Sequence, residues 1–227
     1  MEEIIFIVLI LLTLLTIFCL YKMLDKRGLY FGLVILDLLA FVLSFKISKT
    51  FKMNINLGII PLIASFTVLY ILYTKNNNNK ETKKLLSITL YSNIVAALLI
   101  TIMNFFLPAI TETVSINMQG TFEYNYKILI VYPIIICISQ IATLKLYELL
   151  NQIQDNPLIS ILLTYIITGI IYTIIFYTIS YINILEIAHS VFLGISSYII
   201  GLVISVIHIT FIYFLYKKKV IKWEIFF

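Results

Sequence analysis

The run Lys75-Asn76-Asn77-Asn78-Asn79-Lys80-Glu81-Thr82-Lys83-Lys84 lies between two long apolar segments and decides how the chain is organised. Its lysines and asparagines cannot lie in hydrocarbon, where an unpaired polar group is very costly. The run is therefore predicted to be a loop in water. Because cytoplasmic loops are enriched in Lys and Arg, this loop also assigns a side of the membrane to every other segment.

The composition of the whole chain points to a membrane protein. Of 227 residues, 62% are hydrophobic and 12% are charged, whereas soluble domains have roughly 25% charged residues. The formal net charge is +5, but the basic residues lie at the ends of apolar segments and form no single basic patch. That arrangement is typical of membrane proteins and not of nucleic-acid-binding proteins. We expect one transmembrane domain, residues 1–227, in the lipid bilayer of the cell membrane, with no nucleic-acid partner.

Seven stretches approach the roughly 20 apolar residues that a membrane span needs. They are residues 4–22, 29–45, 57–74, 85–106, 128–150, 158–181 and 190–216. If the 75–84 loop is cytoplasmic, alternation places the N-terminus outside and the C-terminus inside. Twelve Lys and Arg residues then lie on the cytoplasmic side and four lie outside. The sequence therefore predicts an all-α bundle of seven transmembrane helices with this orientation.

Three of the four external basic residues form a cluster, Lys46, Lys49 and Lys52, with no acidic residue nearby. One interpretation is that the cluster binds an anionic group. The other is that these lysines extend from the membrane boundary into water, as lysines at helix ends commonly do. The sequence leaves both open.

Asp37 lies near the middle of the second predicted span and is the leading candidate for a functional residue. A carboxyl group at this depth costs roughly 2.5 to 3.5 kcal/mol on insertion scales. It is expected either to bind a proton, a cation or a polar ligand, or to be a neutral acid hydrogen-bonded to a neighbouring helix.

Other polar residues inside the predicted spans are candidates for lining a central cavity. They are Asn93 and Asn104 in the fourth span, Ser139 and Gln140 in the fifth, and His208 in the seventh. The competing interpretation is adhesion between helices for the amides and the hydroxyl, and ordinary packing for the histidine.

Enzyme signatures are missing from the sequence. It has no HExxH, Gly-x-Ser-x-Gly or CxxC motif and no glycine loop of the kind that binds phosphate. Only two histidines occur, and Cys19 and Cys137 each lie within an apolar segment. We therefore expect no catalytic activity, no metal site and no cofactor.

Several short motifs, spread over nearly the whole chain, resemble the queuosine precursor transporter (vitamin uptake transporter) family. They are Gly28-Leu29-Tyr30 and Lys46 at the two ends of the second span, Leu57-Gly58, Lys80-Glu81-Thr82-Lys83-Lys84, Ser139-Gln140 and Phe211-Ile212-Tyr213. The resemblance implies a core of six helices, to which the first predicted span is added. It also implies uptake of a deazapurine precursor.

Four polar positions that are characteristic of this family differ in this chain. The acidic signature that ends the third span is replaced by 68–75, and the acidic residue after Ser-Gln by Thr143. The Ser-Gln-x-x-Asp motif of the sixth span reads 168–172 here, and the final Asp-Thr-Pro reads His208-Ile209-Thr210. The resemblance therefore implies the family's scaffold, whereas binding of the same precursor by the same groups is not expected.

We hypothesise that the chain takes up a small, largely uncharged heterocycle, either queuosine-precursor-like or vitamin-like, by alternating access. The candidate substrate-binding residues are Asp37, Lys46, Asn93, Ser139, Gln140 and His208. Asp37 or His208 would carry a coupled proton.

Two alternatives of other classes remain. The chain is a non-transporting subunit, or a degenerate paralogue, that packs against a membrane protein or another copy of itself. Otherwise it is the substrate-binding subunit of a multi-component vitamin importer, docking through the small residues Gly194, Ser197, Gly201 and Ser205 of the last span. Ordinary packing inside the chain is the competing use of that row.

Overall fold

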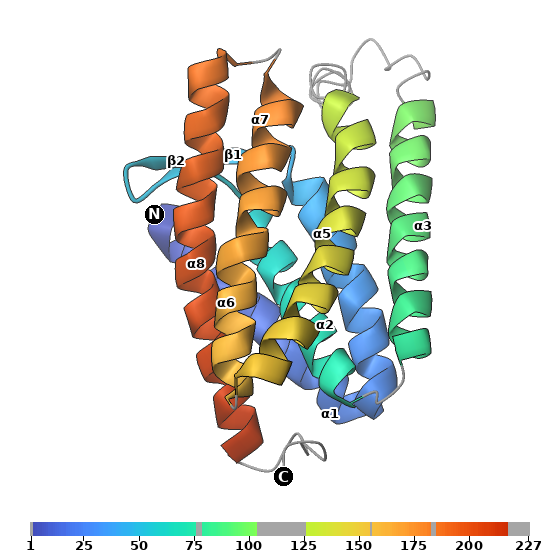
Figure 1. Ribbon diagram of the computed structural model, residues 1–227. Coiled ribbons are helices and arrows are strands. Elements are labelled where there is room, and N and C mark those ends of the chain that lie inside the picture. Colours follow the sequence, from blue (N-terminus) through green and yellow to red (C-terminus); the bar gives the residue numbers. More distant parts are fainter. Residues whose placement is uncertain (1, 76–78, 104–125, 155, 183–184, 218–227) are drawn as a thin grey trace.

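The computed structural model describes residues 2–75, 79–103, 126–154, 156–182 and 185–217 (Figure 1). Its helices are α1 (Glu2–Leu43), α2 (Ile59–Lys75), α3 (Asn79–Met103), α5 (Tyr126–Ile153), α6 (Pro157–Gly169), the π-helix η1 (Ile170–Ile175), α7 (Phe176–Tyr181) and α8 (Ile187–Lys217). Helices α6, η1 and α7 follow one another without a break. Residues 76–78 of the polar run and 104–106 of the fourth predicted span lie outside the described residues.

The described residues have the architecture of a helical multi-pass membrane protein, as the composition predicts. Five helical stretches are long and apolar enough to cross a membrane: Glu2–Leu43, Lys83–Met103, Tyr126–Ile153, Pro157–Tyr181 and Ile187–Leu215. The apolar part of α2, Ile59–Tyr73, is shorter.

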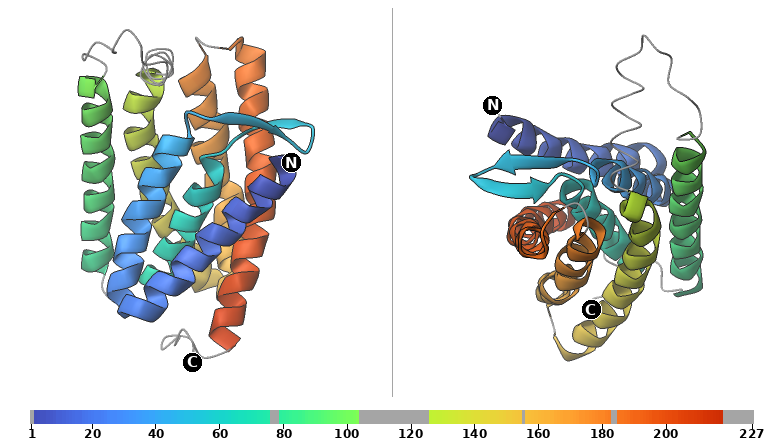
Figure 2. Two further views of the ribbon diagram at one scale, coloured as in Figure 1. Left: turned by 180° about the vertical axis from the view of Figure 1, so that it is seen from behind. Right: turned by 90° about the horizontal axis from the view of Figure 1, so that it is seen from above.

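Helix α1 contains the first two predicted spans, joined across a kink. Asp25 has φ 50° and ψ −132°, which is not helical, so the axis changes direction there. Gly28 follows in the turn. A Cβ at Gly28 would lie 1.9 Å from the carbonyl oxygen of Leu20, so this close approach of two backbone segments requires glycine. The two arms of α1 diverge from this point (Figure 2).

Helix α2 is the central element of the bundle. All residues from Gly58 to Leu72 are buried, and α1, α3, α5 and α8 contact it. The view along the bundle in Figure 2 shows α2 enclosed by its neighbours. A helix that is covered on all sides by other helices needs no polar face, which fits the largely apolar sequence of α2. Pro61 lies in the first turn of α2, where its missing N–H leaves no helical hydrogen bond unmade.

A β-hairpin between α1 and α2 was not predicted. Strands β1 (Ile47–Thr50) and β2 (Met53–Asn56) pair antiparallel, with Ile47 opposite Asn56 and Thr50 opposite Met53. Phe51 and Lys52 form the turn with φ of 52° and 61°, as both central residues of a type I′ turn require. The connection between the second and third predicted spans is therefore a short hairpin within an otherwise helical fold. The usual Asn-Gly signal for such a turn is missing, so the local sequence hardly indicates it.

The ends of the described elements fall into two groups (Figure 1). The kink of α1, the end of α2, the start of α3 and the end of α8 lie at one end of the bundle. The hairpin and the start of α8 lie at the other. The first arm of α1 reaches the hairpin, where the rings of Phe6 and Phe51 meet edge to face with centroids 5.8 Å apart.

Candidate functional site

Asp37 is buried between three helices, with only 1% of its surface exposed. Asn93 of α3 donates from Nδ2 to Oδ2 of Asp37 over 2.5 Å, and Gln140 of α5 donates from Nε2 to Oδ1 over 3.3 Å. Thr89 of α3 in turn donates its hydroxyl to Oε1 of Gln140 over 3.2 Å. We call these four residues the Asp37 cluster. It joins α1, α3 and α5 and contains three of the six predicted site residues.

The surroundings of Asp37 are apolar apart from these amides. Tyr132 of α5 donates to the backbone carbonyl of Asp37 over 3.0 Å, and its ring packs on Phe41 at a centroid distance of 4.9 Å. Among the described residues, no Lys, Arg or His forms an ion pair with Asp37. Burial without a cation favours the uncharged carboxylic acid. The cluster can therefore hold a proton, or it can present amide and carboxyl groups to a polar ligand.

Ser139 is next to Gln140 in the sequence but does not join the Asp37 cluster. Its hydroxyl donates to the carbonyl of Ile135 in the same helix over 2.7 Å. Successive residues on a helix point about 100° apart, so Ser139 and Gln140 cannot both face Asp37. The choice between them was not evident from the sequence.

His208 lies in a second polar cluster, on α8, and is fully buried. Its Nδ1 is 3.0 Å from the hydroxyl oxygen of Thr67 on α2. The hydroxyl oxygen of Tyr165 on α6 lies 2.7 Å from that oxygen of Thr67. Thr67 uses its own proton on the carbonyl of Ile63, at 2.8 Å. With that proton on Ile63, the Thr67 oxygen can accept from the Nδ1–H tautomer of His208. The hydroxyl of Tyr165 also lies 3.4 Å from the carbonyl oxygen of Ile63, to which it donates. Nε2 of His208 has no partner among the described residues.

Lys46 is placed away from both clusters. It lies between α1 and β1, its side chain is exposed, and its backbone carbonyl accepts from the N–H of Leu57 over 3.0 Å. Lys49 and Lys52 are also exposed, on the hairpin. The structure thus brings the three lysines together at one end of the bundle, but Lys46 is not near Asp37.

A third cluster, around Asn56, was missed in the sequence. Asn56 is fully buried at the end of β2 and donates to the carbonyl of Ser44 at 2.6 Å and to the hydroxyl of Tyr181 at 3.1 Å. Its Oδ1 accepts from the N–H of Gly58 at 2.9 Å and from the hydroxyl of Tyr177 at 3.2 Å. The signal was an asparagine two residues before a glycine at the start of an apolar run, a pattern typical of an Asx turn.

The row of small residues on α8 is covered within the chain. A Cβ at Gly194 would lie 2.9 Å from Cα of Ile174, and a Cβ at Gly201 would lie 3.3 Å from the side chain of Ile59. Ser197 accepts from the N–H of Asn56 over 3.2 Å, and Ser205 is fully buried. This row packs inside the bundle and is not an open docking face.

Two pockets lie near the end of the bundle where α1 is kinked. One, of about 770 Å³, lies between the kink and α3. The other, of about 440 Å³, lies between α3 and α5 and includes Tyr73, Cys137 and Glu148 in its wall. None of the six predicted site residues lines either of these pockets. Within the described part of the chain, no three His, Cys, Asp or Glu side chains come together as metal ligands would.

No protein-family model, curated protein or solved structure matches this chain. The resemblance to the queuosine precursor transporter family therefore stays a prediction, and the site has to be interpreted from its own geometry.

Proposed function

We propose that the protein is a cell-membrane transporter that takes up a small, largely uncharged heterocycle, nucleobase-like or vitamin-like, together with a proton. The observation that supports this most is the Asp37 carboxyl group, held by amides from two other helices with no cationic partner among the described residues. Carboxyl groups in membrane helices typically belong to proton relays and substrate pathways.

The proposal includes seven membrane spans with the N-terminus outside and the C-terminus in the cytoplasm. The kink at Asp25 supports it, because the two arms of α1 then count as separate spans. The distribution of charge supports it too. Lys26, Arg27 and Lys84 lie at the kink end of the bundle, which the positive-inside rule assigns to the cytoplasm.

The Asp37 cluster also offers the hydrogen-bonding groups that a heterocycle needs. Asn93, Gln140 and Asp37 provide amide donors and carboxyl or carbonyl acceptors within one connected set. In an open conformation, a ring with adjacent donors and acceptors would replace the contacts that these residues now make with one another. Because the cluster is shared by α1, α3 and α5, movement of one helix against the others would open it.

Uptake by proteoliposomes tests this function. Vesicles containing the purified protein and empty vesicles would be given labelled nucleobases, a deazapurine and water-soluble vitamins, under an inward proton gradient. Protein-dependent accumulation of at least one compound is expected, and Asp37→Asn should abolish it. If no compound on the panel accumulates, or if the variant transports as well as the wild type, the proposal that substrate passes through this cluster is wrong.

A non-transporting membrane subunit is the second candidate. The burial of the Asp37 cluster and the hydrogen bonds among its own members favour it. Asp37, Asn93 and Gln140 are each exposed by 2% or less and satisfy one another across three helices. That is how polar groups act when they hold helices together. Under this alternative the partner is a membrane protein or a second copy of the chain. The purified chain would then bind no compound on the panel and would copurify with its partner in stoichiometric amount.

A further inference from the structure

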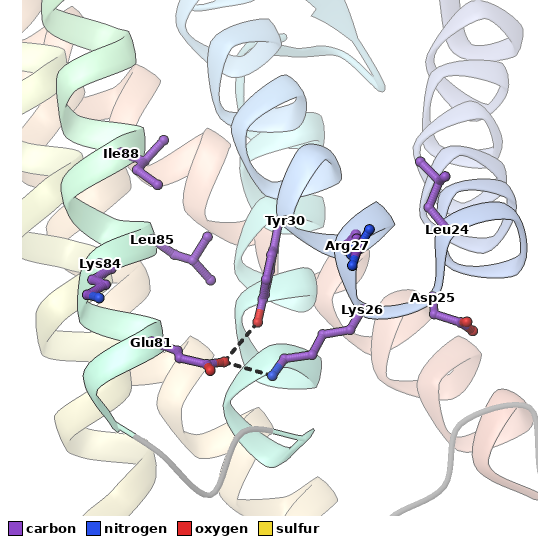
Figure 3. Close-up of a pocket in the computed structure, with 9 residues that line it drawn as sticks. All are labelled: Leu24, Asp25, Lys26, Arg27, Tyr30, Glu81, Lys84, Leu85 and Ile88. Atoms are coloured by element: carbon purple, nitrogen blue, oxygen red, sulfur yellow. Dashed lines mark hydrogen bonds and ion pairs between the residues drawn. The ribbon is translucent and has the colours of Figure 1, made fainter.

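The larger of the two pockets is bounded by both charged and apolar side chains (Figure 3). It has a volume of about 770 Å³ and lies where the kink of α1 faces the first turns of α3. Its lining residues are Leu24, Asp25, Lys26, Arg27, Tyr30, Glu81, Lys84, Leu85 and Ile88. We call it the kink pocket. No candidate residue of the proposed transport site belongs to it.

The kink itself creates the space for this pocket. Because Asp25 leaves the helical conformation, the chain turns within a few residues and the two arms of α1 separate. The second arm is tied to α3 at this level, since Lys26 forms an ion pair with Glu81 at 2.7 Å. The space beside this contact stays open to the surface.

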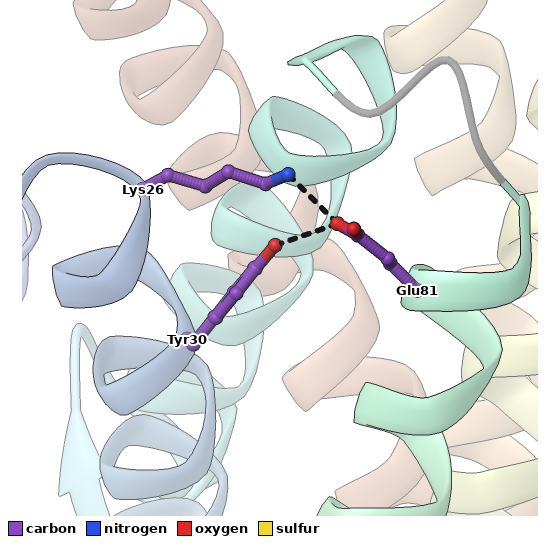
Figure 4. A network of polar contacts seen from close by, with 3 residues as sticks. All are labelled: Lys26, Tyr30 and Glu81. Atoms are coloured by element: carbon purple, nitrogen blue, oxygen red, sulfur yellow. Dashed lines mark hydrogen bonds and ion pairs between the residues drawn. The ribbon is translucent and has the colours of Figure 1, made fainter.

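The polar side of the kink pocket has an excess of positive charge once its internal pairs are counted. Glu81 accepts from Nζ of Lys26 at 2.7 Å and from the hydroxyl of Tyr30 at 3.1 Å (Figure 4). The hydrogen bond from Lys26, and next that from Tyr30, lower the pKa of Glu81. Its negative charge is thus already directed at protein donors. Asp25 is exposed on the turn that also carries Arg27, and its charge offsets one of the two remaining basic groups. Arg27 and Lys84 are exposed on opposite sides of the contact between Lys26, Tyr30 and Glu81 (Figure 3).

The remaining wall of the kink pocket is apolar. Leu24 on the first arm of α1 and Ile88 on α3 have 47% and 50% of their surface exposed, and Leu85 on α3 is buried. A pocket for a free, fully hydrated anion has no need of an exposed apolar wall. An arginine and a lysine beside exposed leucine and isoleucine, at the end of a membrane helix bundle, instead match the boundary between headgroups and acyl chains.

We propose that the kink pocket binds an anionic phospholipid. Its headgroup lies between Arg27 of α1 and Lys84 of α3, whose long side chains reach its phosphate from the two sides of the pocket, and its acyl chain lies along Leu24 and Ile88. The guanidinium and ammonium groups donate to the phosphate oxygens, and the exposed leucine and isoleucine side chains contact the acyl chain. This site does not depend on the proposed transport activity. It depends on the protein lying in a membrane, and its occupant would stabilise the angle between the two arms of α1.

The test compares lipid binding by the purified full-length protein and by two double variants. Native mass spectrometry of the detergent-solubilised protein, with equal amounts of phosphatidylglycerol and phosphatidylcholine, reports how many of each lipid remain bound. The wild type should prefer phosphatidylglycerol. The double variant Arg27→Gln and Lys84→Gln should bind it roughly thirtyfold more weakly, since each of the two basic residues near an anionic surface contributes on the order of 1 kcal/mol.

The matched control removes two charges at the other end of the bundle. The double variant Lys49→Gln and Lys52→Gln, on the exposed hairpin, should keep the wild-type preference. Equal binding of the two lipids by the wild type would overturn the proposal. The same holds if the first double variant keeps the preference or if the hairpin variant loses it equally. If inorganic phosphate displaces the lipid at equal concentration, the pocket binds a simple anion and not a phospholipid.

Discussion

The amide of Asn93 on α3 lies 2.5 Å from Oδ2 of Asp37 on α1. This distance is short for a hydrogen bond from nitrogen and common for one from a hydroxyl group. If the Asn93 amide is rotated by 180°, its oxygen takes the near position and accepts a proton from the neutral acid form of Asp37. The rotation would pair Oδ1 of Asn93, which has no partner among the described residues in the present orientation, and would move Nδ2 into its place. In either orientation this contact joins α3 to α1 at Asp37.

Thr67 is predicted to be the residue that holds the His208 cluster together. Thr67→Val keeps the shape of the side chain but removes the hydroxyl that contacts both Nδ1 of His208 and the hydroxyl of Tyr165. Tyr165 keeps the carbonyl of Ile63 as an acceptor at 3.4 Å, whereas Nδ1 of His208 loses its partner. Leaving a buried donor unpaired costs about 1–3 kcal/mol, so a loss of that size or somewhat more is expected in the free energy of unfolding. Thr101→Val is the control, because the exposed hydroxyl of Thr101 bonds only within its own helix. Equal losses in the two variants would contradict the assignment.

Asn56 is predicted to fix the hairpin to the bundle. Asn56→Ala removes the side-chain contacts to Ser44, Tyr181, Tyr177 and Gly58 at once. Amide hydrogen exchange in residues 47–56 should become faster, because the hairpin then loses its side-chain connections to Ser44 and α7 and keeps only the backbone contact of residue 56 with Ser197 on α8. Asn54→Ala, an exposed position on the same strand, should leave exchange unchanged. Unaltered protection in Asn56→Ala would show that strand pairing alone holds the hairpin.

Gly28 is predicted to be required for the kink, whereas Gly32 is not. A Cβ at Gly28 would lie 1.9 Å from a backbone carbonyl oxygen, so Gly28→Ala forces the two arms of α1 apart. Overpacking of this kind costs roughly 1–3 kcal/mol or more. At Gly32 the nearest atom is the end of the flexible Leu20 side chain at 3.3 Å, so Gly32→Ala should be tolerated. Thermal unfolding in detergent compares the two, and a stable Gly28→Ala variant would argue against this turn.

The contact of Glu81 with Lys26 should depend on pH in one direction. The pKa of Glu81 is lowered by the hydrogen bonds from Lys26 and Tyr30, so ionised Glu81 stabilises the folded state. This contribution is complete above the ordinary glutamate pKa and is lost as the pH falls through the lowered value. The difference in melting temperature between wild type and Glu81→Gln should therefore be small, because the pair is exposed, and should vanish in acid. A difference that grows in acid would contradict the contact.

Part of this structure follows from the cost of burying polar groups in an apolar bundle. The sequence left open whether Asp37 binds a ligand or is hydrogen-bonded to a neighbouring helix, and it offered the amides of other spans as groups that line a cavity or join helices. In the structure Asn93 and Gln140 donate to Asp37. The helical character of the apolar stretches follows from the same cost, since backbone groups in hydrocarbon must pair within the segment.

Other features depend on contacts between distant segments, and local patterns do not contain them. The central position of α2 results from the packing of its neighbours around it. The hairpin depends on Phe51 and Lys52 taking positive φ, which neither residue favours by itself. Asn56 acquires its importance only when Tyr177 and Tyr181, more than a hundred residues later, pack against it.

Proton movement coupled to substrate uptake tests the central claim most directly. Proteoliposomes with a pH-sensitive dye inside would receive the compound that accumulates best, with no proton gradient applied. Acidification of the interior is expected for the wild-type protein and not for Asp37→Asn, whereas Ser139→Ala, which lies outside the Asp37 cluster, should acidify like the wild type. Uptake without acidification, or acidification that persists in Asp37→Asn, would contradict the assignment of Asp37 as the proton-carrying residue.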